Sequence, residues 1–360
     1  MKKILVILTL IFLTNSSELL AQSIQWNNDE SGFYRIQDNE LILHSTNGDK
    51  EIVIISKKDL SPINSTPLKL KGYQFSIDRN KVLIFTNTKR VWRQETKGDY
   101  WILDLNNKKL TKLGKGLPES SLMFAKFSPD GNNVAYVGKE NTNKVRNSTT
   151  NTNIFIENLS NNQIKKLTSS NGTKKLINGT FDWAYEEEFS CRDGFFFNNS
   201  GTKIAFWQID ANQVKDFYMI NNTDSIYSFN VPVEYPKVGQ NPSPAKIGII
   251  DLINNNSLTW IKIPGAPNNN YLPRMTWSPN SDELFIQQLN HKQNHSKLFI
   301  ANTSTGSTKL LMEEKDNAWV DVRSSWPNQV QAGWKFINKG KEFLYTTEKD
   351  GWSHVYRFNI

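Results

Sequence analysis

The chain has 360 residues, with 43 Lys plus Arg against 35 Asp plus Glu, which gives a formal net charge of +8. Apolar residues make up 38% and charged residues 22%, a composition that is typical of folded globular proteins and excludes wholesale disorder. A single cysteine excludes an intramolecular disulfide framework and a cysteine-based zinc site. No run of five or more basic residues occurs, so the charge does not indicate nucleic-acid binding.

Residues 1–22 have the pattern of a secretory signal peptide. Lys2 and Lys3 precede the apolar stretch Ile4–Leu13, which is shorter than the ~20 residues needed to span a bilayer. The small residue Ala21 suits cleavage at the end of this leader. The body, residues 23–360, is therefore expected to be exported, either periplasmic or secreted. The alternative is an uncleaved leader that anchors the body to the membrane.

Short strands with a period of two residues dominate the body. They are rich in β-branched and aromatic residues and are bounded by Asn, Gly, Asp and Ser. The clearest are Glu51–Ile55, Val82–Phe85, Tyr100–Asp104, Asn153–Glu157 and Lys246–Ile250. Long amphipathic helical stretches are missing. The pattern predicts an all-β fold.

A repeated unit organises these strands. Each copy has an aromatic residue, a tight turn of Ser, Asn, Pro, Asp or Gly, and an apolar strand, and most copies are followed by a second hairpin. Clear copies begin at Phe75, Phe127, Phe197, Trp277 and Phe336, and a weaker one covers Phe33–Ser45. Four strands in each unit of fifty or more residues are typical of a β-propeller. We predict an incomplete propeller of about five to six four-stranded blades.

Two units are longer than the others, which predicts insertions at residues 176–192 and 208–244. The first insertion contains three consecutive carboxylates, Glu186 to Glu188, flanked by aromatic residues. A charge run usually marks a solvated surface, but aromatic neighbours favour a binding site. An ammonium group has three donors and one positive charge, so adjacent carboxylates suit a free amine. The spacing alone does not separate an amine from a metal ion.

Several stretches together resemble one known family. They are Asp182–Phe189, Arg192–Phe195, Ile204–Gln208, Tyr218–Ser225, Glu234–Gly239, Val91–Arg93 and Asp350–Tyr356. Their pattern resembles the propeller of the dipeptidyl peptidase IV family, and the resemblance covers nearly all of residues 23–360. The acidic motif of the first stretch is the most specific part.

The resemblance implies a role for each residue of this motif. Glu187 and Glu188 are expected to bind the free N-terminal amine of a peptide, with Glu186 and Tyr185 supporting them. Arg93 is expected to orient a backbone carbonyl of the substrate. The alternative for Arg93 is a surface salt bridge with Glu95 or Asp99.

The family is a group of serine peptidases whose nucleophile lies in a C-terminal α/β-hydrolase domain. The closest string to G-x-S-x-G is Gly351–Val355, which lacks the final glycine. We expect no hydrolase domain and no catalytic residue within these 360 residues, so that this chain alone is inactive. The expected function is the substrate-selecting N-terminal propeller of a secreted exopeptidase that releases X-Pro or X-Ala dipeptides. The alternatives are a non-catalytic secreted propeller that binds peptides or a protein partner, and a gene remnant.

Other features carry less chemistry. His291 and His295 are predicted to lie in a hairpin turn, so no metal is expected, and no cofactor is implied. Cys191 is predicted to be buried, and His354 to pack at a blade edge. Most tryptophans are expected to pack between blades.

The second insertion carries the apolar stretches Phe217–Ile220 and Ile226–Phe229, which predict a hairpin. The family resemblance implies a homodimer contact there, and neither nucleic acid nor stable membrane insertion is expected.

Overall fold

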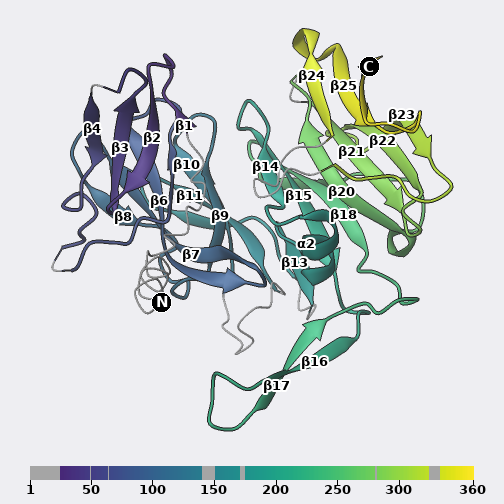
Figure 1. Cartoon of the computed structure of the whole chain (residues 1–360), viewed down its shortest axis with the longest axis horizontal. Coiled ribbons are helices and arrows are strands. Elements are labelled where there is room, and N and C mark those ends of the chain that lie inside the picture. Colours follow the sequence, from purple (N-terminus) through teal and green to yellow (C-terminus); the bar gives the residue numbers. More distant parts are fainter. Residues whose placement is uncertain are drawn as a thin grey trace, which may run out of the picture. The chain divides into compact units, whose positions relative to one another are not determined.

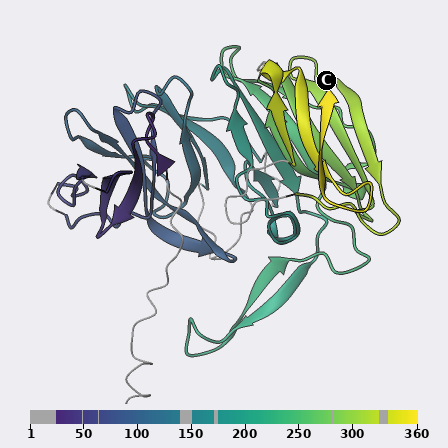
Figure 2. The same ribbon diagram turned by 45° about the horizontal axis from the view of Figure 1, so that its top comes forward.

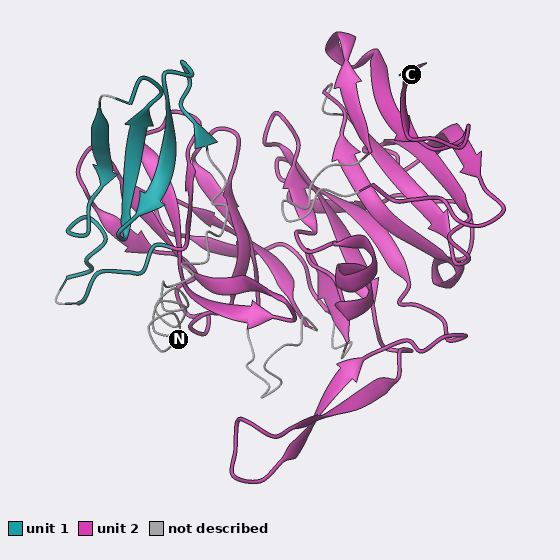
Figure 3. Cartoon of the chain, in the orientation of Figure 1, with its two compact units in different colours: residues 1–70 teal, residues 71–360 magenta. Residues whose placement is uncertain are grey.

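Figure 1 shows the computed structural model, in which short antiparallel strands make up most of the chain. The structure describes residues 25–48, 50–63, 65–139, 151–170, 175–279, 282–323 and 333–360. The leader that the sequence predicts lies outside these residues. The chain divides into two compact units, residues 1–70 and residues 71–360 (Figure 3).

The first unit contains one antiparallel sheet of four strands. In order they are β1 (Gln25–Trp26), β2 (Gly32–Gln37), β3 (Glu40–Ser45) and β4 (Glu51–Ile55). Leu41 and Ile55 face each other across β3 and β4, and both are fully buried. The weaker copy that the sequence predicts at Phe33–Ser45 thus forms the central hairpin of a complete blade.

The second unit begins with two four-stranded groups that share one sheet. The first group is β5 (Gly72–Phe75), β6 (Lys81–Val91), β7 (Gln94–Asp104) and β8 (Leu110–Lys112). The second is β9 (Leu122–Phe127), β10 (Asn133–Gly138), β11 (Asn153–Asn158) and β12 (Ile164–Lys166). The two groups are joined because β7 pairs with β9 at Gly98 and Leu122.

The next sheet contains the first insertion. Its strands are β13 (Leu176–Asn178), β14 (Phe195–Phe197), β15 (Lys203–Asp210), β18 (Ala245–Asp251) and β19 (Ser257–Trp260). Both β13 and β14 pair with β15, so they share one strand position. The segment between them contains the helix α2 (Trp183–Phe189). The prediction that the insertion starts at Leu176 is wrong, because residues 176–178 are buried and paired with β15.

The second insertion forms a hairpin of β16 (Asp216–Asn221) and β17 (Phe229–Glu234). Figure 2 shows this hairpin standing away from the other strands of its unit. The sequence predicts a second strand at Ile226–Phe229, but that strand begins only at Phe229. Ile226 and Tyr227 lie in the connecting loop, with 97% and 84% of their surface exposed.

Two further sheets complete the second unit. One has four strands, β20 (Asn270–Trp277), β21 (Glu283–Asn290), β22 (His295–Asn302) and β23 (Thr308–Lys315). The other has three strands, β24 (Trp334–Ile337), β25 (Glu342–Thr347) and β26 (His354–Asn359). The described residues thus form five four-stranded groups and one of three strands, in agreement with the predicted five to six blades.

In the second unit the predicted turns connect β5 to β6, β9 to β10, β14 to β15 and β24 to β25, and the turn expected after Trp277 includes residues 280 and 281, which lie outside the described residues. In two of them a serine hydroxyl donates to the aspartate two residues later, Ser76 to Asp78 and Ser128 to Asp130. Gly131 has φ +70°, a left-handed conformation that costs glycine little. Asp78 and Asp130 also accept from the backbone N–H groups of Asn80 and Asn132, both at 3.1 Å, so these side chains satisfy backbone donors within the turn.

Aromatic residues that are buried or partly buried join neighbouring sheets. The indole N–H of Trp207 donates to Leu272 O at 2.8 Å, and that of Trp277 donates to Phe196 O at 3.0 Å. Trp207 and Trp277 thus join neighbouring sheets as predicted, whereas Trp26, Trp319 and Trp352 are 52–76% exposed. His354 lies on β26, the last strand of its sheet, as predicted, but its side chain is 57% exposed and its Nδ1 contacts Asp350 Oδ2 at 2.9 Å. Across the described residues, no helix is long and apolar enough to cross a bilayer.

Phe285 of β21 is central to the core between the last two sheets. It is fully buried and packs edge-to-face on Phe336 and Phe343, with ring centroids 4.6 and 5.7 Å apart. Phe285→Ala should lower the free energy of unfolding by about 3–5 kcal/mol, because it leaves a cavity between sheets. Leu310→Ala on the neighbouring β23, where the side chain is 44% exposed, is the control. Urea unfolding measures both, and equal effects would contradict this packing.

Candidate functional site

The acidic motif folds as the short helix α2. Asp182 caps its N-terminus, where its carboxylate accepts a hydrogen bond from Tyr185 N at 3.0 Å and another from Ser243 Oγ at 2.6 Å. These bonds satisfy a free backbone donor of the first turn. Burial raises the pKa of Asp182, against the opposing effect of the Ser243 hydrogen bond. Ser190 ends the helix in a left-handed conformation with φ +55°.

The inner face of α2 packs against strand β20. Tyr185 is buried, and its hydroxyl accepts a hydrogen bond from Leu272 N at 3.1 Å. At the C-terminus of the helix, Arg274 donates to Phe189 O at 2.8 Å and to Cys191 Sγ at 3.3 Å. Cys191 is buried, as the sequence predicts, and burial raises the pKa of its thiol to about 11. These contacts fix both ends of the helix.

Glu186 points into the protein. Its side chain is 6% exposed, and its Oε1 accepts a hydrogen bond from Arg192 Nε at 2.9 Å. Burial raises the pKa of Glu186 to about 7, although Arg192 acts in the opposite direction, and the nearby charge of Glu187 adds to the increase. Glu186 therefore supports the helix from within rather than facing solvent.

Glu187 meets Arg93, which lies 94 residues earlier in the chain. Arg93 Nε donates to Glu187 Oε2 at 2.9 Å, and Arg93 Nη2 donates to Glu187 Oε1. The alternative partners do not pair with Arg93. Glu95 pairs with Lys71 at 3.3 Å and Asp99 with Lys112 at 3.4 Å. The structure therefore brings Arg93 to the acidic motif, and the local salt bridges considered from the sequence are wrong.

A strained turn presents Arg93. Trp92 and Arg93 form the two-residue turn between β6 and β7, where Val91 pairs with Gln94. Trp92 has φ +51°, a conformation that costs a bulky residue roughly 1–3 kcal/mol. The tertiary structure holds this turn in place, since Val91 is buried and Trp92 packs against the same apolar cluster.

Glu188 is exposed and has no hydrogen bond or ion pair with any other described residue. Consecutive helix residues point about 100° apart, so the side chains of Glu187 and Glu188 leave α2 in different directions, although both are at least partly exposed. Glu188 lies near Tyr271, whose pKa is raised first by burial and second by the charge of Glu188. The motif thus combines one buried carboxyl group, one paired carboxylate and one that is open to a ligand.

The alternative of a metal ion finds no ligand set here. Within the described ranges, no group of three or more His, Cys, Asp and Glu side chains is placed to hold a metal ion. Two of the three carboxylates of the motif already form ion pairs, Glu186 with Arg192 and Glu187 with Arg93.

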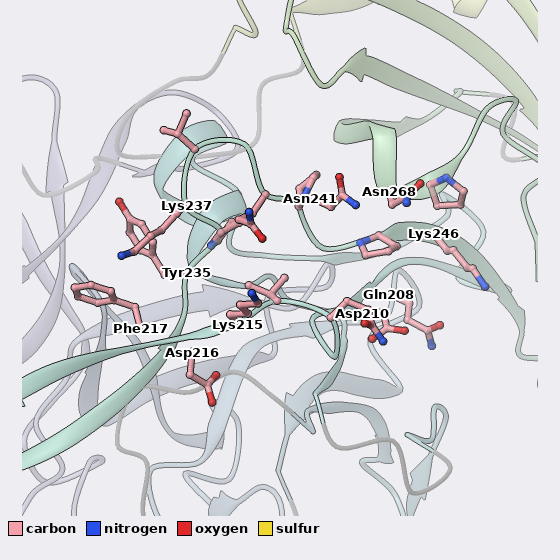
Figure 4. A pocket seen from close by; sticks show the side chains of 18 of the residues that line it. Gln208, Asp210, Lys215, Asp216, Phe217, Tyr235, Lys237, Asn241, Lys246 and Asn268 are labelled. Atoms are coloured by element: carbon pink, nitrogen blue, oxygen red, sulfur yellow. The ribbon is translucent and has the colours of Figure 1, made fainter.

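A cavity of about 840 Å³ borders the Arg93–Glu187 pair, and we call it the Trp92 pocket. It is lined by Trp92, Arg93, Trp183, Glu187, Phe217, Met219, Val233, Tyr235, Lys237 and Val238. A second cavity, of about 1180 Å³, lies at the base of the hairpin and shares Phe217, Tyr235, Lys237 and Val238 with the first (Figure 4). The sequence gives the hairpin an apolar character but does not indicate that it lines a pocket beside the acidic motif.

All five predicted site residues therefore lie on α2 or on the turn that meets it. Glu187, Glu188 and Arg93 face the surface, and Tyr185 and Glu186 are buried beneath them. Arg192 and Arg274 are additional residues that hold the helix. Arg192 follows the acidic motif closely in sequence, but nothing local predicts Arg274, which comes from β20.

The raised pKa of Glu186 predicts a pH dependence of stability. Between its ordinary pKa of 4.5 and about 7, the folded protein binds a proton that the unfolded chain has lost. The part of the free energy of unfolding that Glu186 contributes therefore falls as pH rises through this window. Relative to Glu186→Gln, the wild-type free energy of unfolding should fall by about 1–3 kcal/mol between pH 4.5 and 7. Urea unfolding across this range checks it, and a constant or growing difference would contradict it.

Comparisons with known proteins agree with this architecture. The family model described as "Dipeptidyl peptidase IV (DPP IV) N-terminal region" matches residues 76–360. The dipeptidyl peptidase 4 of Felis catus is 26% identical over 368 residues, which covers 97% of this chain and 45% of that protein. The dipeptidyl peptidase 4 of Trichophyton rubrum is 25% identical over 351 residues, which covers 94% of this chain and 42% of that protein. The chain thus spans less than half the length of these relatives.

Solved structures show the same fold. The dipeptidyl peptidase 4 of Porphyromonas gingivalis has a TM-score of 0.79 at 23% identity, which covers 94% of this chain and 45% of that one. A putative dipeptidyl aminopeptidase IV from Bacteroides ovatus has a TM-score of 0.65 at 20% identity, which covers 91% and 41%. These likenesses, with the successive four-stranded sheets, confirm the predicted all-β propeller fold.

Proposed function

The chain belongs to the dipeptidyl peptidase IV family, and we propose that it is the substrate-selecting propeller of an exported serine exopeptidase that removes N-terminal dipeptides. Its export, to the periplasm or the medium, is supported by the leader pattern of residues 1–22. Because the chain spans 45% of its Felis catus relative, we assign the acyl-transfer chemistry to a hydrolase domain outside these 360 residues. A preference for Pro or Ala as the second residue of the substrate is part of the same proposal and is supported by family resemblance alone.

The observation that carries this proposal is the contact between Arg93 and α2. It places a guanidinium group and two carboxylates, Glu187 and Glu188, at one surface. A peptide N-terminus presents the matching chemistry, with an ammonium group and a carbonyl oxygen a few bonds away. Glu188, which has no partner among the described residues, accepts hydrogen bonds from the ammonium group.

Arg93 has donors left for the carbonyl. Its Nε and Nη2 donate to Glu187, whereas its Nη1 has no hydrogen-bond partner in the described part of the chain. The planar guanidinium can therefore hold Glu187 and a substrate carbonyl at the same time. Glu187 would share its negative charge between Arg93 and the ammonium group, while the more exposed Glu188 supplies the second carboxylate.

Two structural features limit where the amine can sit. Glu186 is buried against Arg192, so the third carboxyl group of the motif does not compete for the ligand. Tyr185 and Arg274 anchor α2 to β20, and Arg93 holds Glu187 from the other side. A peptide with a blocked N-terminus would therefore lose the charged interaction between its ammonium group and these carboxylates.

Removing the charge of Glu188 should weaken the binding of free amines. Glu188→Gln should lower the affinity for the dipeptide Gly-Pro by about tenfold to a hundredfold, because a hydrogen bond between charged groups becomes one to a neutral amide. Isothermal titration calorimetry measures the affinity. N-acetylated Gly-Pro should bind wild type and variant equally weakly.

The control variant is Glu119→Gln, which removes an exposed carboxylate far along the chain from the motif and should leave the affinity for Gly-Pro unchanged. If the wild-type chain binds free and acetylated Gly-Pro equally well, the assignment of the amine site is wrong.

We also propose that the β16–β17 hairpin mediates homodimerisation. Large apolar side chains of the hairpin and its loop support this role, because they are 42–97% exposed. They are Phe217, Tyr218, Met219, Ile220, Ile226, Tyr227 and Phe229. A concentration of exposed apolar side chains on one hairpin is typical of an interaction site.

Sedimentation velocity at micromolar concentration should show a dimer that Ile226→Asp converts to monomer, since a charge buried in an apolar contact is costly. Ile253→Asp, at an exposed turn outside the hairpin, is the control and should remain dimeric. A wild-type chain that sediments as a monomer would rule out this role for the hairpin.

A further inference from the structure

The cavity of about 1180 Å³ lies at the base of the β16–β17 hairpin, and we call it the hairpin-base pocket (Figure 4). Its lining residues fall within 208–218, 235–246 and 267–268, all in the second unit. This volume exceeds the ~300–1,000 Å³ of most sites for one small molecule. The pocket therefore has room for a ligand of several linked units.

Three lysines line this pocket without a carboxylate partner. Lys215, Lys237 and Lys246 form no ion pair with any residue that the structure describes. Lys237 Nζ lies 5.3 Å from the ring centroid of Phe217, and Lys246 Nζ lies 5.9 Å from that of Trp260. An aromatic ring carries no net charge, so these ammonium groups can still donate hydrogen bonds to an anion.

The two carboxylates of the lining are already engaged within the protein. Asp216 pairs with Lys175, which is not a lining residue. Asp210 accepts hydrogen bonds from the backbone and side-chain nitrogens of Asn212, at 3.0 and 2.5 Å. Three lysines against two engaged carboxylates make the lining net positive, which favours an anionic ligand over a neutral or cationic one.

The positive charges are spread along the pocket. Figure 4 shows Lys237 and Lys246 at opposite sides of the view, with Lys215 between them. A single small anion is compact and can neutralise only the lysines closest to it. This arrangement therefore favours an elongated ligand that carries several anionic groups.

Amide side chains supply much of the remaining polar lining. Those of Gln213, Gln240, Asn241 and Asn268 form no hydrogen bond with another described residue. Each amide has a carbonyl acceptor and two N–H donors. Hydroxyl groups match this set well, because each of them both donates and accepts hydrogen bonds.

The lining suits a carbohydrate better than an acidic peptide. An extended peptide is commonly bound through main-chain hydrogen bonds, but Pro236, Pro242, Pro244 and Pro267 have no N–H to donate. A carbohydrate bonds through its hydroxyl groups to side chains instead. Its ring can also pack on an aromatic side chain such as Tyr218, which lines the pocket and is 61% exposed.

We propose that the hairpin-base pocket binds an acidic oligosaccharide. Its carboxylates contact the three lysines, and its hydroxyl groups contact the amide side chains. This site goes beyond the proposed function, because it uses neither Glu187 nor Glu188.

The test uses trigalacturonic acid, which has three carboxylates on linked sugar rings, and its trimethyl ester, in which these groups are neutral. On the whole 360-residue chain, isothermal titration calorimetry should show the acid binding about tenfold or more tighter than the ester. Raising NaCl from about 50 to 500 mM should weaken the binding of the acid only, since salt screens charges.

A lysine variant tests the location of the site. Lys246→Gln should weaken the binding of the acid about tenfold and leave that of the ester unchanged, because it removes a charge but keeps a polar side chain. Lys309→Gln is the matched control, since Lys309 is an exposed lysine of β23 outside the pocket, and it should bind the acid as the wild type does. Equal melting temperatures show that both variants are folded.

Three results would overturn this inference. The first is a wild-type chain that does not bind the acid, or binds acid and ester alike. The second is an equal effect of Lys246→Gln and Lys309→Gln. The third is tighter binding of N-acetylated triaspartate than of trigalacturonic acid, which would make an acidic peptide the occupant. None of these results depends on the binding of Gly-Pro, so the proposed function is tested separately.

Discussion

The contact between Arg93 and Glu187 is the interaction on which the candidate site depends. It joins the turn between β6 and β7 to α2, two segments that lie 94 residues apart in the chain. An exposed ion pair of this kind contributes little to stability, commonly about 0–1 kcal/mol, because water and salt screen it. Its importance is geometric, because it holds the Arg93 guanidinium next to the Glu187 carboxylate, whose negative charge it neutralises only in part.

The stability of the site comes from what lies beneath this pair. Tyr185 hydrogen-bonds to β20, Arg274 holds the C-terminus of α2, and Asp182 caps the N-terminus. A seven-residue helix has little stability of its own in water, so these tertiary contacts keep it folded. The buried Glu186 and Arg192 pair adds a desolvation cost, which the raised pKa of Glu186 expresses. The site is thus a surface arrangement supported by buried polar contacts.

Much of the fold could be predicted from local sequence. The alternation of apolar and polar residues locates strands such as Glu51–Ile55, which the structure reproduces as β4. The Ser-Asp and Gly-containing turns mark the start of each blade, since their side chains stabilise the turn locally. The second strand of the hairpin is harder to locate from sequence, because Ile226 and Tyr227 have strand-forming side chains but lie in an exposed loop. Strand propensity does not reveal whether a partner strand is in register.

The partners of the site residues could not be predicted from short stretches of sequence. The acidic motif and Arg93 could be found from sequence, yet the neighbours of Arg93 in sequence indicate Glu95 or Asp99 as partners, and the fold supplies Glu187 instead. Contacts between residues this far apart depend on how the sheets pack, which no short window contains. The same holds for Arg274 and for the pocket wall that the hairpin contributes.

The most direct measurement is a crystal structure of the chain with Gly-Pro bound. Our account predicts the dipeptide ammonium within hydrogen-bond distance of both Glu187 and Glu188 and a carbonyl oxygen on Arg93, whereas a dipeptide whose ammonium contacts neither carboxylate would contradict it.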